Sequence, residues 1–165
     1  MLKAEVLEFL QKIDAHVGKA FPGSEKFPLR IIGKCALLLS GLEDAVGTVD
    51  LDSLSVEAQS EHKAVADALL ENFGRKQQTV HGYYLEFVGV ALVFLPPKPT
   101  WIALEGSWKN IDATYLEIHD VIASKCFSAF STTPRTKDKR DVSAPSTRYD
   151  HRELRRRSAD VRSRG

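Results

Sequence analysis

The fold of this chain is decided by two neighbouring stretches, IIGKCALLLSG at residues 31–41 and TVDLD at residues 48–52. In the first stretch, apolar residues lead into a glycine turn and then into a run typical of a short, buried helix. In the second stretch, apolar and acidic residues alternate, which predicts a strand over residues 48–54. The chain therefore passes from a glycine turn through a helix into a strand that carries two acids.

These two acids, Asp50 and Asp52, are candidate metal ligands. They are two positions apart, so on a strand their side chains point to the same face, about 6.6 Å apart along the backbone. Mg²⁺ prefers oxygen ligands and keeps coordination positions for substrate phosphates, so the pair is typical of a metal and nucleotide site. The pattern Asp-x-Asp alone also fits the solvated face of an edge strand.

Apolar residues that recur at three- and four-residue steps predict three further helices. The first runs for about five turns from Leu2 and ends near Pro22. The second carries Val65, Leu69 and Phe73 and ends at Gly74, and the last covers about residues 120–130.

A second strand region is predicted at residues 81–88 and 90–95, which are rich in Tyr, Phe and Val. Only Gly89 separates the two segments, so they form one bent strand or two adjoining strands. Helices and strands together predict a mixed α/β or α+β domain, with a small mixed sheet flanked by helices.

The composition predicts one domain followed by a tail. The chain has 165 residues, of which 43% are hydrophobic and 27% are charged. Residues 1–142 carry 16 basic and 19 acidic side chains, whereas residues 143–165 carry seven arginines, no lysine and three acidic side chains. We therefore expect residues 143–165 to form a basic tail that does not pack on the domain. A disordered or truncated end fits this composition better than an RNA-binding arm, because basic runs alone are weak evidence for nucleic-acid binding.

No part of the sequence is apolar for long enough to cross a membrane. The longest apolar stretch, residues 87–95, contains Gly89, whereas a membrane helix needs about 20 residues. Lys3, Glu5 and Glu8 occupy positions where a secretory signal needs an unbroken apolar core. We expect a cytoplasmic protein of bacterial type, with no membrane partner.

The stretches at residues 31–41 and 48–52 resemble the nucleotidyltransferase superfamily, whose pattern is an apolar strand, Gly-Gly or Gly-Ser, a short helix and Thr-x-Asp-x-Asp. A second block, DVIASK at residues 120–125 followed by Arg135, is similar to the C-terminal signature of abortive-infection type nucleotidyltransferase toxins. The resemblance implies a nucleotidyltransferase fold for residues 1–142.

The same resemblance implies an enzyme that moves a nucleoside monophosphate from a nucleoside triphosphate (NTP) to an acceptor hydroxyl, with Mg²⁺ as cofactor. Asp50 and Asp52 would hold the metal together with a third acid on a neighbouring strand. Glu86 is the candidate, because it is the only acid in residues 81–88. A Glu86 that simply faces solvent is the alternative.

The resemblance also implies a set of nucleotide-binding residues: Gly33, Lys34, Thr48, Lys125, Lys137 and Asp138. Lys34 replaces the second glycine or the serine of the family pattern, so it either contacts a phosphate or obstructs the turn.

Two readings of the function follow. In the first, the protein is an active transferase whose acceptor is RNA or a protein, and a toxin-like member of this kind would have an antitoxin-like partner. In the second, it is a catalytically inactive module that keeps the fold for interaction or nucleotide sensing.

Overall fold

One mixed sheet of five strands organises the part of the chain that the structure, a computed structural model, describes: residues 1–42, 47–55 and 60–131. The strands are β1 (Phe27–Ile31), β2 (Asp50–Leu54), β3 (Tyr84–Val88), β4 (Trp101–Ala103) and β5 (Ile111–Leu116), in the spatial order β3-β2-β1-β5-β4. The pairs β2–β3 and β1–β5 are parallel, and the pairs β1–β2 and β4–β5 are antiparallel. The predicted tail at residues 143–165 lies outside the described residues.

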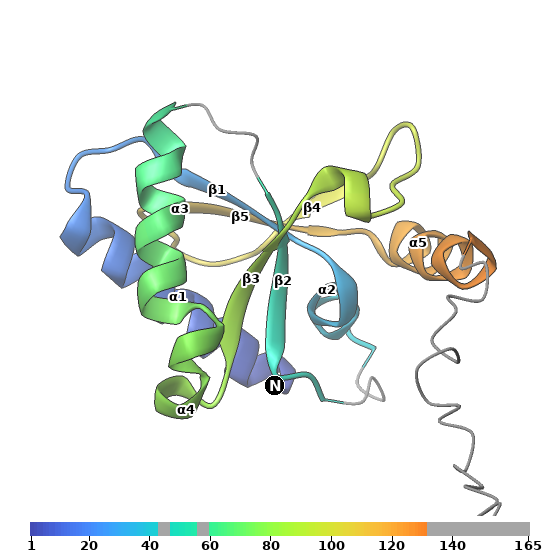
Figure 1. The fold of residues 1–165 in the computed structure, drawn as a ribbon, viewed down its shortest axis with the longest axis horizontal. Coiled ribbons are helices and arrows are strands. Elements are labelled where there is room, and N and C mark those ends of the chain that lie inside the picture. The colour runs from blue at the N-terminus through green and yellow to red at the C-terminus, as the bar shows by residue number, and fades with distance from the viewer. Residues whose placement is uncertain (43–46, 56–59, 132–165) are drawn as a thin grey trace, which may run out of the picture. The chain divides into compact units, whose positions relative to one another are not determined.

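Helices lie on both faces of this sheet (Figure 1). They are α1 (Lys3–Ala20), α2 (Gly33–Leu39), α3 (Ser60–Phe73), α4 (Gln78–His81) and α5 (Ile118–Ser131), with short 3₁₀ turns η1 (Arg75–Gln77) and η2 (Val90–Leu92). In Figure 1, α1 and α3 lie on one side of the strands and α2 and α5 on the other. The small mixed sheet flanked by helices that the sequence predicts is confirmed. Within the described ranges, no helix has the length and apolar content that crossing a membrane requires.

The two faces of the sheet bury separate cores. The larger core joins the sheet to α1, α3 and the Cys35, Leu38 and Leu39 side of α2, and the smaller joins it to Ala36 of α2 and to α5. Strand β2 contributes to both, since Leu51 belongs to the larger core and Leu54 to the smaller. This split follows from the alternation of side chains along a strand.

The predicted apolar stripes of α1 and α3 are confirmed. Each faces the larger core, and the buried residues are Val6, Phe9, Leu10, Ile13 and Val17 in α1 and Val65, Leu69 and Phe73 in α3. Helix α3 ends just before Gly74, whose N–H donates to the Leu70 carbonyl at 3.0 Å. A Cβ at position 74 would overlap this carbonyl oxygen, so the turn requires glycine.

The strand predicted at residues 90–95 is wrong. Residues 90–92 form η2, and Val90 and Leu92 are 45% and 82% exposed. A strand must pair its backbone groups with a neighbour, and the pairing of β3 with β2 ends at Val88. The strand predicted to begin at residue 81 begins instead at Tyr84, because α4 and a left-handed Gly82, with φ of 77°, precede it.

Strands β4 and β5 were not predicted, although β5 lies inside the sheet between β1 and β4. Its sequence, IDATYL, combines buried Ile111 and Leu116 with the exposed Asp112 and the small Ala113, which weakens its apolar signal.

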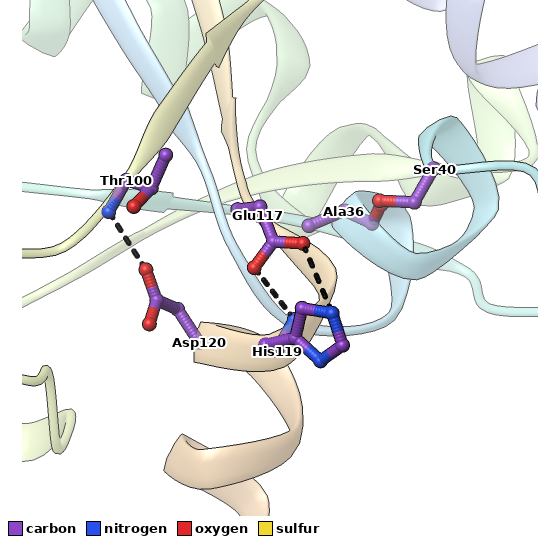
Figure 2. Close-up of polar contacts among 6 residues, drawn as sticks. All are labelled: Ala36, Ser40, Thr100, Glu117, His119 and Asp120. Carbon is purple, nitrogen blue, oxygen red and sulfur yellow. Dashed lines mark hydrogen bonds and ion pairs between the residues drawn. The ribbon is translucent and has the colours of Figure 1, made fainter.

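Helix α5 is held at its start by two carboxylates (Figure 2). The N–H of Thr100, just before β4, donates to Asp120 at 2.7 Å, and the N–H of His119 donates to Glu117 at 2.8 Å. Carboxylates at a helix N-terminus also complement the helix dipole. Figure 2 further shows Ser40, whose hydroxyl donates to the Ala36 carbonyl at 2.8 Å at the end of α2.

Asp14 of α1 fixes the start of β5, because its carboxylate accepts the N–H groups of Asn110 at 2.8 Å and Ile111 at 3.0 Å. Asp14→Ala should lower the free energy of unfolding by about 2 kcal/mol, since it leaves both donors without this acceptor. Asp67→Ala is the matched control, because it makes the same change at an exposed position of helix α3. Urea denaturation measures both; equal stability of the two variants would contradict this role of Asp14.

Candidate functional site

Three carboxylates meet on the face of the sheet that α2 and α5 cover. Parallel pairing places Asp50 opposite Tyr84 and Asp52 opposite Glu86. Asp50, Asp52 and Glu86 each offer a carboxylate oxygen, and these three oxygens lie within 4.8 Å of one another. Asp50 and Asp52 are partly buried, whereas Glu86 is exposed. This acidic triad, which joins the three predicted acids, can hold a metal ion.

The turn at Gly33 makes room for the triad. Gly33 has a φ of 67°, a left-handed conformation that favours glycine. A Cβ at this position would lie 2.8 Å from the Asp52 Oδ2 atom. The adjacent Ile32 N–H donates to the Asp52 carbonyl at 2.9 Å, which ties the turn to β2. The glycine is therefore required both by the backbone and by the Asp52 carboxylate.

The electrostatics of the triad are dominated by burial and by like charges. Burial first, and then the neighbouring carboxylates of Asp50 and Glu86, raise the pKa of Asp52 to about 6, against the lowering effect of Lys125. Burial, followed by Asp52 and Asp50, also raises the pKa of the Cys35 thiol to about 12. Cys35 donates to the Asp50 carbonyl at 3.3 Å, so it is a neutral packing residue behind the triad.

Thr48 is a direct partner of Asp50. Its hydroxyl donates to the Asp50 carboxylate, and its carbonyl accepts the N-terminal ammonium of Met1. Thr48 is only 6% exposed. The structure therefore places Thr48 where it orients one acid of the triad.

A cavity of about 170 Å³ adjoins the triad at Asp52. Gly33 and Asp52 contribute to its wall from the sheet side, and Ser124, Lys125 and Ser128 contribute from α5. The rest of the lining is apolar: Ile32, Val88, Leu92, Val93, Leu116 and Val121. The cavity therefore combines an acidic edge, a cation and an apolar wall, which is a common composition of small-molecule sites.

The other candidate residues lie elsewhere. Lys34 is exposed on α2 and does not line this cavity. Lys137 and Asp138 lie outside the described residues, as does Arg135.

Sequence reasoning missed two serines that line the cavity beside Asp52, and Tyr84 and Arg75, which contact each other next to β2. Ser124 and Ser128 are four residues apart on α5, a spacing that puts them on one helix face and could have been noticed. Tyr84 shares its strand face with Glu86, and Arg75 lies over its ring, with the guanidinium carbon 5.8 Å from the ring centre. Only the fold brings Arg75 there, because η1 and β3 are separate elements.

No family model, curated protein or solved structure matches this chain.

Asp52→Asn should stabilise the protein at pH 7.5 in the absence of divalent cations. The folded state holds the Asp52 proton with a pKa of about 6, above the ordinary 3.8, so ionisation costs stability as the pH rises from about 4 to 6. After allowance for solvent screening, we expect a gain of about 1 kcal/mol at pH 7.5 and none at pH 4.

Urea unfolding at the two pH values measures this difference. Asp67→Asn on the exposed face of α3 is the control and should give the same small change at both pH values. A pH-independent effect of Asp52→Asn would show that like-charge repulsion and burial do not act on this carboxylate.

Proposed function

We propose that this protein is a Mg²⁺-dependent nucleotidyltransferase, which moves a nucleoside monophosphate from an NTP to an acceptor hydroxyl. The observation that carries the proposal is the acidic triad, whose three oxygens lie within 4.8 Å of one another on two parallel strands. The order of elements supports a nucleotidyltransferase fold. An apolar strand, a glycine turn and a short helix precede an antiparallel strand with Asp50 and Asp52, and a parallel strand adds Glu86.

The donor set fits magnesium. All three ligands are carboxylate oxygens, which Mg²⁺ prefers over nitrogen and sulfur. The pKa of Asp52 is raised first by burial and then by repulsion from Asp50 and Glu86, and a divalent cation would relieve that repulsion. When bound by Asp50, Asp52 and Glu86, Mg²⁺ would polarise the phosphate and neutralise the charge of the leaving group.

The cavity beside Asp52 supports a position for the nucleotide. Lys125 supplies a cation for the phosphates, and Ser124 and Ser128 supply hydroxyl donors from the same wall. The apolar lining on the other side suits the uncharged part of the nucleotide.

The reaction needs one proton acceptor and one leaving group. The acceptor hydroxyl oxygen forms a bond to the α-phosphorus while the bond from that phosphorus to the bridging oxygen breaks, and pyrophosphate leaves with the bonding electrons. The hydroxyl proton passes to Glu86, the most exposed acid of the triad. Thr48 keeps Asp50 oriented during this step through its hydrogen bond.

Replacing both aspartates, Asp50→Asn with Asp52→Asn, should weaken Mg²⁺ binding by about 100-fold or more, because two of the three charged ligands are lost. Binding of Mg²⁺ and of mixed NTPs is measured by calorimetry, and turnover by release of pyrophosphate. The double variant Asp67→Asn with Asp112→Asn, which alters exposed acids outside the triad, is the control. Unchanged Mg²⁺ affinity in the first variant would exclude the triad as the metal site.

Turnover separates the two readings of the function. Release of pyrophosphate by the wild type with total RNA or protein as acceptor supports the active enzyme. NTP binding without turnover on RNA, protein or a small phosphorylated acceptor would favour the inactive module.

Lys125 and Lys34 should differ sharply in their effect on nucleotide affinity. Lys125→Gln should weaken Mg-NTP binding about tenfold, because Lys125 lines the cavity and a charge-assisted contact is lost. Lys34→Gln makes the same change at an exposed position off the cavity and should alter the affinity less than about threefold. The reverse ranking in a calorimetric titration would show that the phosphates bind at the Gly33 turn and not in the cavity.

A further inference from the structure

A second cation, Arg75, contacts the ring of Tyr84, the β3 residue that pairs with Asp50. Arg75 begins η1, and its guanidinium carbon lies 5.8 Å from the centre of the Tyr84 ring. Tyr84 is 7% exposed and pairs with Asp50 in the sheet. A guanidinium on an aromatic face is attracted by the ring, so this contact holds Arg75 on the ring of the residue that pairs with Asp50.

The strand register places Tyr84, which Arg75 contacts, at one end of the triad and the cavity with Lys125 at the other. In the parallel register of β2 and β3, Asp50 and Tyr84 come first, and Asp52 and Glu86 follow two residues later. Lys125 lines the cavity with Asp52 and Val88, whereas neither Asp50 nor Tyr84 lines it. Figure 1 shows α4, which follows η1, near the start of β3, and α5 toward the other end of the strand.

The backbone fixes the position of Arg75. Gly74 ends α3 in a turn where a Cβ would overlap the Leu70 carbonyl oxygen, and the Gln77 N–H closes η1 by donating to the Gly74 carbonyl at 2.8 Å. The turn at Gly74, which only glycine permits, therefore sets the backbone position of Arg75, the first residue of η1. Arg75 lies in an ordered turn and not in a flexible loop.

The guanidinium of Arg75 forms no ion pair within the described residues. Its side chain is exposed, and among the described residues the ion pairs join Lys12 to Glu8 and His119 to Glu117, so none involves Arg75. The contact with Tyr84 uses the face of the guanidinium and leaves the N–H groups at its edge. Those planar donors match the oxygens of a phosphate.

We propose that Arg75 binds a phosphate group of the acceptor, and that the acceptor is therefore a phosphate-bearing molecule rather than a protein hydroxyl. The inference rests on the proposed function, because it assigns the Asp50 side of the triad once the nucleotide occupies the cavity on the Asp52 side. An in-line transfer requires the acceptor hydroxyl opposite the leaving pyrophosphate. A cation at the Asp50 end then meets the acceptor and not the triphosphate.

The test compares Arg75→Gln with Lys76→Gln, which removes the same charge from the next residue of η1, also exposed. The protein is loaded with Mg²⁺ and a non-hydrolysable ATP analogue, and the affinity for this analogue is measured first. Two acceptor probes follow, a short single-stranded RNA and glycerol 3-phosphate. We expect Arg75→Gln to weaken binding of one probe about tenfold and to reduce its salt dependence, while the affinity for the analogue stays within about twofold.

The outcomes separate this inference from the proposed function. Weaker RNA binding identifies a nucleic-acid acceptor, and weaker glycerol 3-phosphate binding identifies a small phosphorylated acceptor; both support the inference. Equal probe affinities in wild type and both variants, or no probe binding by an analogue-loaded protein, overturn it alone. A loss of analogue affinity in Arg75→Gln also overturns it, because Arg75 would then belong to the nucleotide side. A wild type that binds neither Mg²⁺ nor the analogue overturns the proposed function as well.

Discussion

The parallel pairing of β2 with β3 is the interaction on which the site depends. It brings Asp52 opposite Glu86, although the two residues are far apart in the sequence. The cost is the repulsion that contributes to the raised pKa of Asp52. On the other face of the same strands, Leu51 and Leu85 are 0% and 1% exposed. Burying each such side chain contributes about 1.5–3 kcal/mol, which exceeds the roughly 1 kcal/mol that the ionised Asp52 costs after solvent screening.

Because side chains alternate along a strand, β2 packs Leu51 into the core on one face and presents Asp50 and Asp52 on the other. Cys35 and the Gly33 turn contact both the packed core and the acids. Cys35 packs in the larger core and donates to the Asp50 carbonyl, and the Gly33 turn leaves space for the Asp52 carboxylate. The resemblance gave this glycine a role toward phosphates, and the structure shows a second reason for it. Any side chain at position 33 would be strained by the φ of 67° and would press on Asp52.

The sequence predicted the elements with a strong local signal. The helices with periodic apolar residues, the β2 segment and the shared face of Asp50 and Asp52 needed only local spacing, and Glu86 could be chosen as the single acid of its segment. The strand predicted at residues 90–95 was wrong because high β-propensity cannot replace a partner strand. Strand β5 was missed for the opposite reason. Its mixed sequence carries a weak strand signal, and its pairing with β1 along Phe27–Ile31 stabilises it instead.

The missed strand also explains why the cavity could not be predicted. Helix α5 follows β5 directly and is anchored to the segment before β4 through Asp120 and Thr100, so the position of Lys125 depends on both strands. Arg75 likewise reaches the Tyr84 ring only through the folded η1 turn. Three carboxylates with the exposed cation Lys125 beside them leave a negative site that repels a free triphosphate. If the proposed function holds, cation binding must therefore accompany nucleotide binding, and each should strengthen the other by the same factor.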